Sequence, residues 1–353
     1  ARSVTLGVML VVAWLVARLF VEFDGDAGLP QFVIAAPFMP ALGSTLRFAM
    51  DGYNAFLVLL TVLLFPVALA CSWPAAESRR PLFLSLLLLL EGALLGTFLA
   101  QDLLVFFVLW EAVLIPTVLL VLVFGGAERR RAALTFFLYT MAGSVVLLAA
   151  VIYLGAEGAR QYGEWTFDYA ALERLPLSAG QQAFVLVAVA LACAVKSPLF
   201  PFHSWLPLAY RESPAPVTAL MAGVMSKMGA YGFLRLALPL APDAVVQFGP
   251  VLVALAAVSV VYGAVLALRQ RDYKLLVAYA SLSHMGYVVL GTFSLQSTGL
   301  HGAMLQMLSH GLVVAGLFLL LGMIEQRRGA AWLQVHGLAT RAPRMAVVLM
   351  LFV

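Results

Sequence analysis

The stretch AVKSPLFPFHSWLPLAY, residues 194–210, contains the two features that decide how this chain is built. Lys196 follows fifteen residues without one charged side chain, a run typical of a helix that is buried in lipid. Three prolines follow within ten residues: Pro198, Pro201 and Pro207. Each removes a backbone donor and clashes with the preceding helical turn. The stretch therefore predicts a helix that breaks near residues 197–201, directly after a lysine.

The composition predicts an integral membrane protein. The residues AVILMFWYC make up 63% of the 353 residues and charged residues only 11%, whereas soluble domains are about half apolar. Apolar runs of about 18 residues or more, enough to cross about 30 Å of hydrocarbon, recur from end to end. We expect an all-α, polytopic helix bundle, a single domain over residues 1–353. An eleventh span begins near residue 343. The ten complete spans are 3–22, 51–73, 82–100, 103–124, 132–154, 181–200, 215–240, 246–268, 275–293 and 302–325.

The basic residues report the orientation of these spans. The odd-numbered connections hold three of them, Arg47, Arg160 and Arg174. The even-numbered connections hold thirteen, namely Arg79, Arg80, Arg129, Arg130, Arg131, Arg211, Arg269, Arg271, Lys274, Arg327, Arg328, Arg341 and Arg344. Because Lys and Arg accumulate in cytoplasmic loops, we expect the even connections to be cytoplasmic and loops 23–50 and 155–180 to lie opposite. The net charge of +4 is thus explained without a nucleic-acid partner.

The sequence has no motif for a resident cofactor. It contains no Gly-rich phosphate loop, no dinucleotide fingerprint and no CxxC. Cys71 and Cys193 fall inside apolar spans without the spacing of a metal site, so we interpret them as small core residues. We expect no redox cofactor and no metal in this chain.

Five ionisable residues lie far from the ends of their spans, where a charge costs about 2.5–3.5 kcal/mol to insert. They are Glu111, Lys196, Lys227, His284 and His310. The simpler interpretation is that each is buried separately and satisfied by a neighbouring helix, but five in one bundle favour a shared role. Burial lowers the pKa of an amine and a nearby carboxylate raises it again, so a rearranging partner can make a lysine hold or release a proton. We predict that Glu111 pairs with Lys196, directly or through one water.

Other polar residues have simpler explanations. Glu91 is central in its span, and a packing carboxyl and a functional one remain open alternatives for it. We expect Arg235 to extend to the lipid headgroups and Lys274 to anchor a span end. The three remaining histidines, His203, His301 and His336, are expected to be structural. The backbone carbonyls freed at the proline break must face protein or a hydrated cavity, as in the ion sites of transporters.

Four stretches together carry a resemblance to a known family. They are FFVLWEAVLIP (106–116), residues 194–236 from AVKSPLF to YGFLRL, DYKLLVAYASLSHMGYVVLG (272–291) and LQMLSHGLVVAGLFLLLGMIEQRRG (305–329). From about residue 51 onward the chain resembles the antiporter-like membrane subunits of respiratory complex I, the proton-pumping NADH:quinone oxidoreductase. The glutamate after Trp110 and the sequence SHGL are most similar to its chain M, or chain 4, type.

The resemblance implies a fold, a set of roles and a set of partners. The fold contains two inverted repeats of five helices, each with one broken helix. Glu111 and Lys196 would be the acid and lysine that gate proton affinity, Lys227 the central lysine, and His284 and His310 the relay beyond it. NADH, FMN, iron–sulfur clusters and quinone are expected in partner subunits, and other membrane subunits, including neighbouring antiporter-like ones, as contacts. A bacterial cytoplasmic membrane is expected, with the mitochondrial inner membrane as the alternative.

Two other functions remain open. The same broken-helix and lysine motifs occur in multi-subunit sodium/proton antiporters, and a scaffold that keeps the charges without pumping is the third possibility. Compared with the family, the sequence lacks the first helix and the C-terminal helices that hold the second break. We therefore expect it to be part of a longer subunit.

Overall fold

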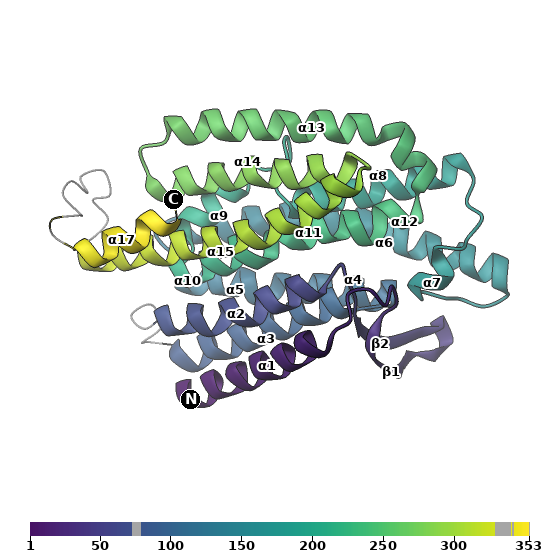
Figure 1. Cartoon of the computed structure of the whole chain (residues 1–353), viewed down its shortest axis with the longest axis horizontal. Helices are drawn as coiled ribbons and strands as arrows, with labels where there is room; N and C mark the ends of the chain where they lie inside the picture. Colours follow the sequence, from purple (N-terminus) through teal and green to yellow (C-terminus); the bar gives the residue numbers. More distant parts are fainter. Residues whose placement is uncertain (73–78, 329–339, 341, 353) are drawn as a thin grey trace.

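The computed structural model describes residues 1–72, 79–328, 340 and 342–352. Long helices lie side by side along one direction (Figure 1). Within the described ranges, nine helices or helix runs are long and apolar enough to cross a membrane, and Ala55–Cys71 and Pro343–Phe352 are shorter apolar helices. The predicted all-α membrane bundle is confirmed, while the inverted repeats stay a prediction.

The long elements overlap the predicted spans. They are α1 (Arg2–Glu22), α2 (Ala55–Cys71), α3 (Arg80–Leu99), α4 (Leu103–Ala112), α5 (Leu114–Phe124), α6 (Arg129–Tyr162), α8 (Ala179–Lys196), α13 (Pro242–Arg269), α14 (Tyr273–Phe293), α15 (Ser297–Arg328) and α17 (Pro343–Phe352). The predicted span 103–124 is two helices, α4 and α5, which meet at Val113. Short helices η1 (Pro40–Leu42), α7 (Tyr169–Leu172) and α9 (Leu206–Glu212) lie in the connections.

One crossing segment is buried inside the bundle over residues 215–237. It runs through α10 (Ala215–Leu220), the π-helical turn η3 (Met221–Met225), α11 (Ser226–Gly232), a second π-helical turn η4 (Phe233–Ala237) and α12 (Leu238–Leu240). Its most apolar window is wholly buried, whereas that of α13 is only 22% buried. This central segment carries Lys227, so every neighbour of that lysine is protein.

The loop predicted over 23–50 contains a β-hairpin, which the helix-based interpretation missed. Strand β1 (Gln31–Met39) pairs antiparallel with β2 (Ser44–Met50), and Gly43 makes the turn with a left-handed φ of 62°. Strand β1, QFVIAAPFM, is apolar after its first residue and shows no period-2 alternation, so its sequence does not distinguish it from an apolar loop or a short helix.

The connections gather at two opposite ends of the bundle (Figure 1). At one, called here the basic end, Glu212 accepts from the Glu128 backbone N at 2.8 Å and Arg211 pairs with Asp272 at 3.3 Å. At the other, the hairpin end, Asp102 accepts from Ser44 Oγ at 3.0 Å. The predicted cytoplasmic connections 125–128 and 270–272 thus lie together, away from loops 23–50 and 163–178.

Candidate functional site

Helix α8 ends at Lys196, where the proline pattern predicts the break. The Cys193 carbonyl keeps its helical partner, Ser197 N, at 2.8 Å. The carbonyls of Ala194 and Val195 lose theirs, because Pro198 has no N–H, and accept instead from Leu199 N at 2.9 Å and from the Trp205 indole at 3.0 Å. These carbonyls are expected to face either protein or a hydrated cavity, and in the structure they bind protein donors. The hydrogen bonds at the break therefore fix the position of Lys196, and these backbone carbonyls are not left without donors.

Lys196 lies against Trp110 of α4. Its Nζ is 3.4 Å from the Trp110 carbonyl oxygen, to which it donates, and 4.9 Å from the centroid of the indole ring. The indole is itself oriented by a hydrogen bond of 3.2 Å from Nε1 to Ser144 Oγ of α6. The lysine is 3% exposed. A carbonyl dipole and a π face, both suited to a cation, surround its ammonium group.

Glu111 does not form the predicted direct ion pair. In the part of the chain that the structure describes, no salt bridge joins it to Lys196, because the ammonium group is held against Trp110. The Glu111 carboxylate still acts on Lys196 through space. One of its oxygens is buried without a hydrogen-bond partner among the described residues. The direct pairing is therefore wrong, and the pairing through one water stays a prediction.

Lys227 is fully buried and bound on three sides. Its Nζ lies 2.6 Å from the Ala222 carbonyl of the π-helical turn η3 and 3.2 Å from Ser226 Oγ. The third partner is His310 Nδ1 of α15, at 2.7 Å. Lysine and histidine are therefore two nitrogen bases joined by one short hydrogen bond across a helix interface.

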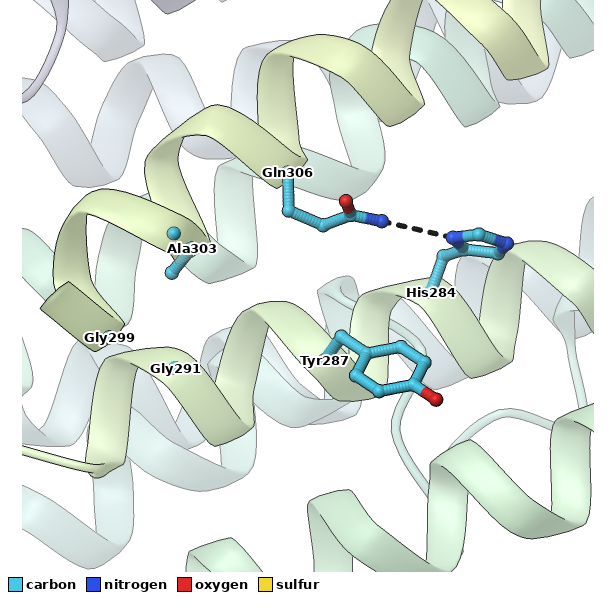
Figure 2. A pocket seen from close by; sticks show the side chains of 7 residues that line it. His284, Tyr287, Gly291, Gly299, Ala303 and Gln306 are labelled. Carbon is cyan, nitrogen blue, oxygen red and sulfur yellow. Dashed lines mark hydrogen bonds between the residues drawn. The ribbon is translucent and has the colours of Figure 1, made fainter.

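A second histidine lies next to His310, toward the outside of the bundle. The rings of His310 and His284 stack with centroids 5.5 Å apart and an interplanar angle of 26°. His284 Nδ1 lies 2.9 Å from the Gln306 amide nitrogen, the contact drawn in Figure 2. His310 is 6% exposed, whereas His284 lies on the outer face of α14, beside a groove of about 480 Å³ between α14 and α15. The structure thus brings Lys227, His310 and His284 into one series.

Two contacts join the Lys196 group to this series. Ser197 Oγ donates to the Ser226 carbonyl at 2.8 Å, and each serine is the chain neighbour of one of the lysines. Gly229 lies against the end of α8, where an added Cβ would be 2.4 Å from the Cys193 carbonyl oxygen. The close approach of α11 to α8 therefore needs a residue without a side chain.

Two members of the site, Trp110 and Gln306, are not among the predicted residues. Trp110 holds Lys196, and Gln306 binds His284. A signal existed for Gln306, since it precedes His310 by four residues and so lies on the same helix face. No local signal identifies the carbonyl oxygen of Trp110 as a ligand of Lys196.

Three further predictions can be compared with the structure. Arg235 does not extend to the headgroups, because it is 8% exposed and forms an ion pair with Asp51 inside the bundle. Lys274 is buried rather than a surface anchor, and pairs with Glu325 at 2.8 Å. Glu91 is 3% exposed, with one oxygen unpartnered among the described residues. His336 lies outside the described residues.

The geometry allows proton transfer between Lys227 and His310. A proton on Lys227 Nζ already points along the hydrogen bond to His310 Nδ1, so transfer needs little movement of heavy atoms. His310 Nε2 is buried with no partner among the described residues, and the neighbouring His284 ring is stacked on it rather than hydrogen-bonded to it, so a further step needs a bridging water. Two adjacent positive charges repel, so the pair favours one excess proton at a time.

Comparisons with known proteins agree with these observations. Residues 100–353 match the family model described as NADH:quinone oxidoreductase/Mrp antiporter, TM. The chain is 40% identical over 324 residues to NAD(P)H-quinone oxidoreductase chain 4 2 of Thermosynechococcus vestitus, covering 92% of this chain and 60% of that protein. It is 38% identical over 309 residues to NADH-quinone oxidoreductase subunit M of Escherichia coli strain K12, covering 86% and 61%. The chain thus spans about 60% of the length of these relatives.

Solved structures give the same assignment. A chain of respiratory complex I from Thermus thermophilus with bound NADH superposes with a TM-score of 0.91 at 37% identity, covering 100% of this chain and 73% of that one. A chain of the Mrp complex from Dietzia sp. DQ12-45-1b superposes at 0.79 and 26% identity, covering 93% and 35%. With its broken helix and its buried lysines, the chain belongs to the NADH:quinone oxidoreductase/Mrp antiporter family, as an antiporter-like subunit of the chain 4 or M type.

Proposed function

We propose that this chain is a proton-translocating membrane subunit of an NADH:quinone oxidoreductase. The single observation that carries the proposal is the 2.7 Å contact between Lys227 Nζ and His310 Nδ1, between two residues buried in the centre of the bundle. A buried amine that shares its proton with an imidazole can load and release that proton without leaving the low-dielectric interior.

The second lysine supplies the control of this step. Lys196 lies at the end of α8 and is tied through Ser197 and Ser226 to the helix of Lys227. A movement of α8 therefore changes the distance between two buried cations, and so the electrostatic cost of keeping both protonated. Glu111 offsets part of that cost because its carboxylate acts on Lys196.

The proposal includes partners that supply the driving reaction. We propose that NADH, FMN, iron–sulfur clusters and quinone are held by other subunits, and that neighbouring antiporter-like subunits cover part of this bundle. A bacterial cytoplasmic membrane is the proposed location, with the even-numbered connections facing the cytoplasm. Supporting this, a relative from Escherichia coli is named as a subunit of NADH-quinone oxidoreductase.

The test uses the whole complex reconstituted in vesicles, with NADH-driven acidification as the readout. Replacing Lys227 with Ala removes the shared proton, and we expect pumping to fall by about a hundredfold, the lower end of what a positioned acid–base group contributes. Lys227→Arg should fail as well, because a guanidinium keeps its proton. Arg130→Ala, an exposed charge at the basic end, is the control and should pump normally. Normal pumping by Lys227→Ala would refute the proposal.

A sodium/proton antiporter subunit is the second candidate, favoured by the similarity to a chain of the Mrp complex. The same vesicles separate the two functions. An imposed sodium gradient would move protons through an antiporter without NADH, whereas the proposed subunit would show no such exchange. If the chain were a scaffold that does not pump, NADH-driven acidification by the complex would be unchanged in both Lys227→Ala and Lys227→Arg.

A further inference from the structure

Arg235 occupies an unusual place for a fixed charge. It lies in the π-helical turn η4, eight residues beyond Lys227 toward the hairpin end, or about 12 Å along the helix. Its guanidinium forms a buried ion pair with Asp51, which precedes α2. Its Nε is buried and has no hydrogen-bond partner among the described residues.

A cavity at the hairpin end reaches down to this ion pair. Its volume is about 820 Å³, room for many waters at about 30 Å³ each. The polar residues that line it include Asp51, Gln101, Tyr169, Glu173, Arg235 and His301. The Tyr169 hydroxyl, like Arg235 Nε, is buried without a partner among the described residues. Buried polar groups without a protein partner are usually satisfied by water, so this lining favours a hydrated cavity.

An aromatic layer lies between the cavity and the two lysines. Tyr231 is one helical turn from both Lys227 and Arg235, and its hydroxyl donates to the Phe98 carbonyl at 2.9 Å. Phe98 and Phe106 surround its ring, with centroids at 5.4 and 6.3 Å. Phe106 in turn contacts Trp110 at 5.5 Å, the residue against which Lys196 lies. All four side chains are at most 1% exposed.

We propose that Arg235, held by Asp51 above this aromatic layer, is a charge barrier that stops protons in the hairpin-end cavity from reaching Lys227. A guanidinium does not release its proton, so a chain of water molecules that conducts protons ends there. Its positive charge also disfavours an excess proton in the water beside it. Asp51 lowers the cost of burying the guanidinium and keeps it at the floor of the cavity. The inference rests on the proposed function, because a barrier matters only where a proton path exists.

The experiment measures passive proton conductance, without NADH, in vesicles that contain the whole complex. An imposed pH gradient should decay several-fold faster with Arg235→Gln than with the wild type. The double variant Asp51→Asn with Arg235→Gln removes both charges and leaves two amides able to hydrogen-bond, so it tests the same point without an unpaired buried charge. Adding Lys227→Ala to Arg235→Gln should restore the slow decay, since the leak must pass through that lysine.

Arg47→Gln is the matched control, because Arg47 pairs with Asp168 at the same end but does not line the cavity. Its conductance should equal that of the wild type. Wild-type conductance in both Arg235 variants would overturn the barrier, as would an equal leak in Arg47→Gln or a leak that survives Lys227→Ala. Failure of the proposed function has a different readout, namely NADH-driven pumping that persists in Lys227→Ala.

Discussion

At the scale of single residues, the site depends on hydrogen bonds between helices that are distant in the sequence. His310 is the partner that gives Lys227 a proton acceptor, and 83 residues separate the two. Lys196 has no such acceptor, since its bonds go to a backbone carbonyl and an indole face. In the proposed mechanism the two lysines therefore differ: Lys227 has a neighbouring base to which it can pass its proton, whereas Lys196 would act through its charge.

Replacing His310 with Leu tests the acceptor. If the imidazole receives the proton of Lys227, as proposed, NADH-driven pumping should fall by about a hundredfold. The measurement is the rate of acidification in vesicles containing the complex. Tyr287→Phe, an exposed change on α14, should leave the rate unchanged. A His310→Leu complex that pumps at the wild-type rate would exclude His310 from the path.

Replacing Glu111 with Gln tests the action of a charge through space. The substitution keeps the shape but removes the carboxylate that acts on Lys196, so the balance of charge between the two lysines changes. We expect a smaller loss of pumping than for Lys227→Ala, because Glu111 makes no direct ion pair. A loss as complete as that of Lys227→Ala would mean that the carboxylate is itself on the proton path.

At the scale of elements, the broken helix and the π-helical segment form one unit. The end of α8 is held by donors from residues 197–205, and Ser197 then binds the segment that carries Lys227. Gly229 permits this contact, because α11 lies so close to the α8 backbone that even the Cβ of an alanine would collide with it. The element that supplies Lys196 and the element that supplies Lys227 are thus positioned by each other.

Replacing Gly229 with Ala should loosen this unit. The added Cβ would lie 2.4 Å from the Cys193 carbonyl oxygen and 2.7 Å from the Ser197 backbone N, so the helices must separate. Overpacking of this kind costs about 1–3 kcal/mol. We expect a lower thermal midpoint for the purified complex together with reduced pumping. Gly92→Ala, in open space on α3, is the control and should leave the midpoint equal or slightly higher. Equal midpoints for both variants would show that the contact can relax.

At the scale of the whole molecule, the bundle has two chemically different ends. Basic connections gather at one end, and the hairpin and the cavity lie at the other. Between them the central segment is wholly buried, so charges on it interact with protein rather than with lipid. The positive-inside rule then predicts that the basic end faces the cytoplasm.

Cysteine labelling in intact cells tests this orientation. In a Cys71→Ser background, where Cys193 stays buried, Arg130→Cys should be protected from a membrane-impermeant thiol reagent. Arg160→Cys, exposed at the hairpin end, should react. Inverted vesicles should give the opposite pattern. Labelling of Arg130→Cys in intact cells would reverse the assigned orientation.

Helices, the break after Lys196, and the buried positions of Lys196, Lys227 and His310 follow from the sequence by itself. Apolar run length and proline act locally, and a charge in the middle of such a run is costly wherever it faces. The resemblance carried by the same stretches led to the family.

Only the tertiary structure decided which partner each charge has. Lys196 binds the carbonyl of Trp110, 86 residues away, rather than the carboxylate of Glu111, and Arg235 pairs with Asp51, 184 residues away, rather than with headgroups. The hairpin at 31–50 and the exposed position of His284 also needed the fold. The physical reason is that helical periodicity, which is visible in the sequence, determines which residues share a face of a helix. What that face contacts depends on how helices distant in the sequence pack together.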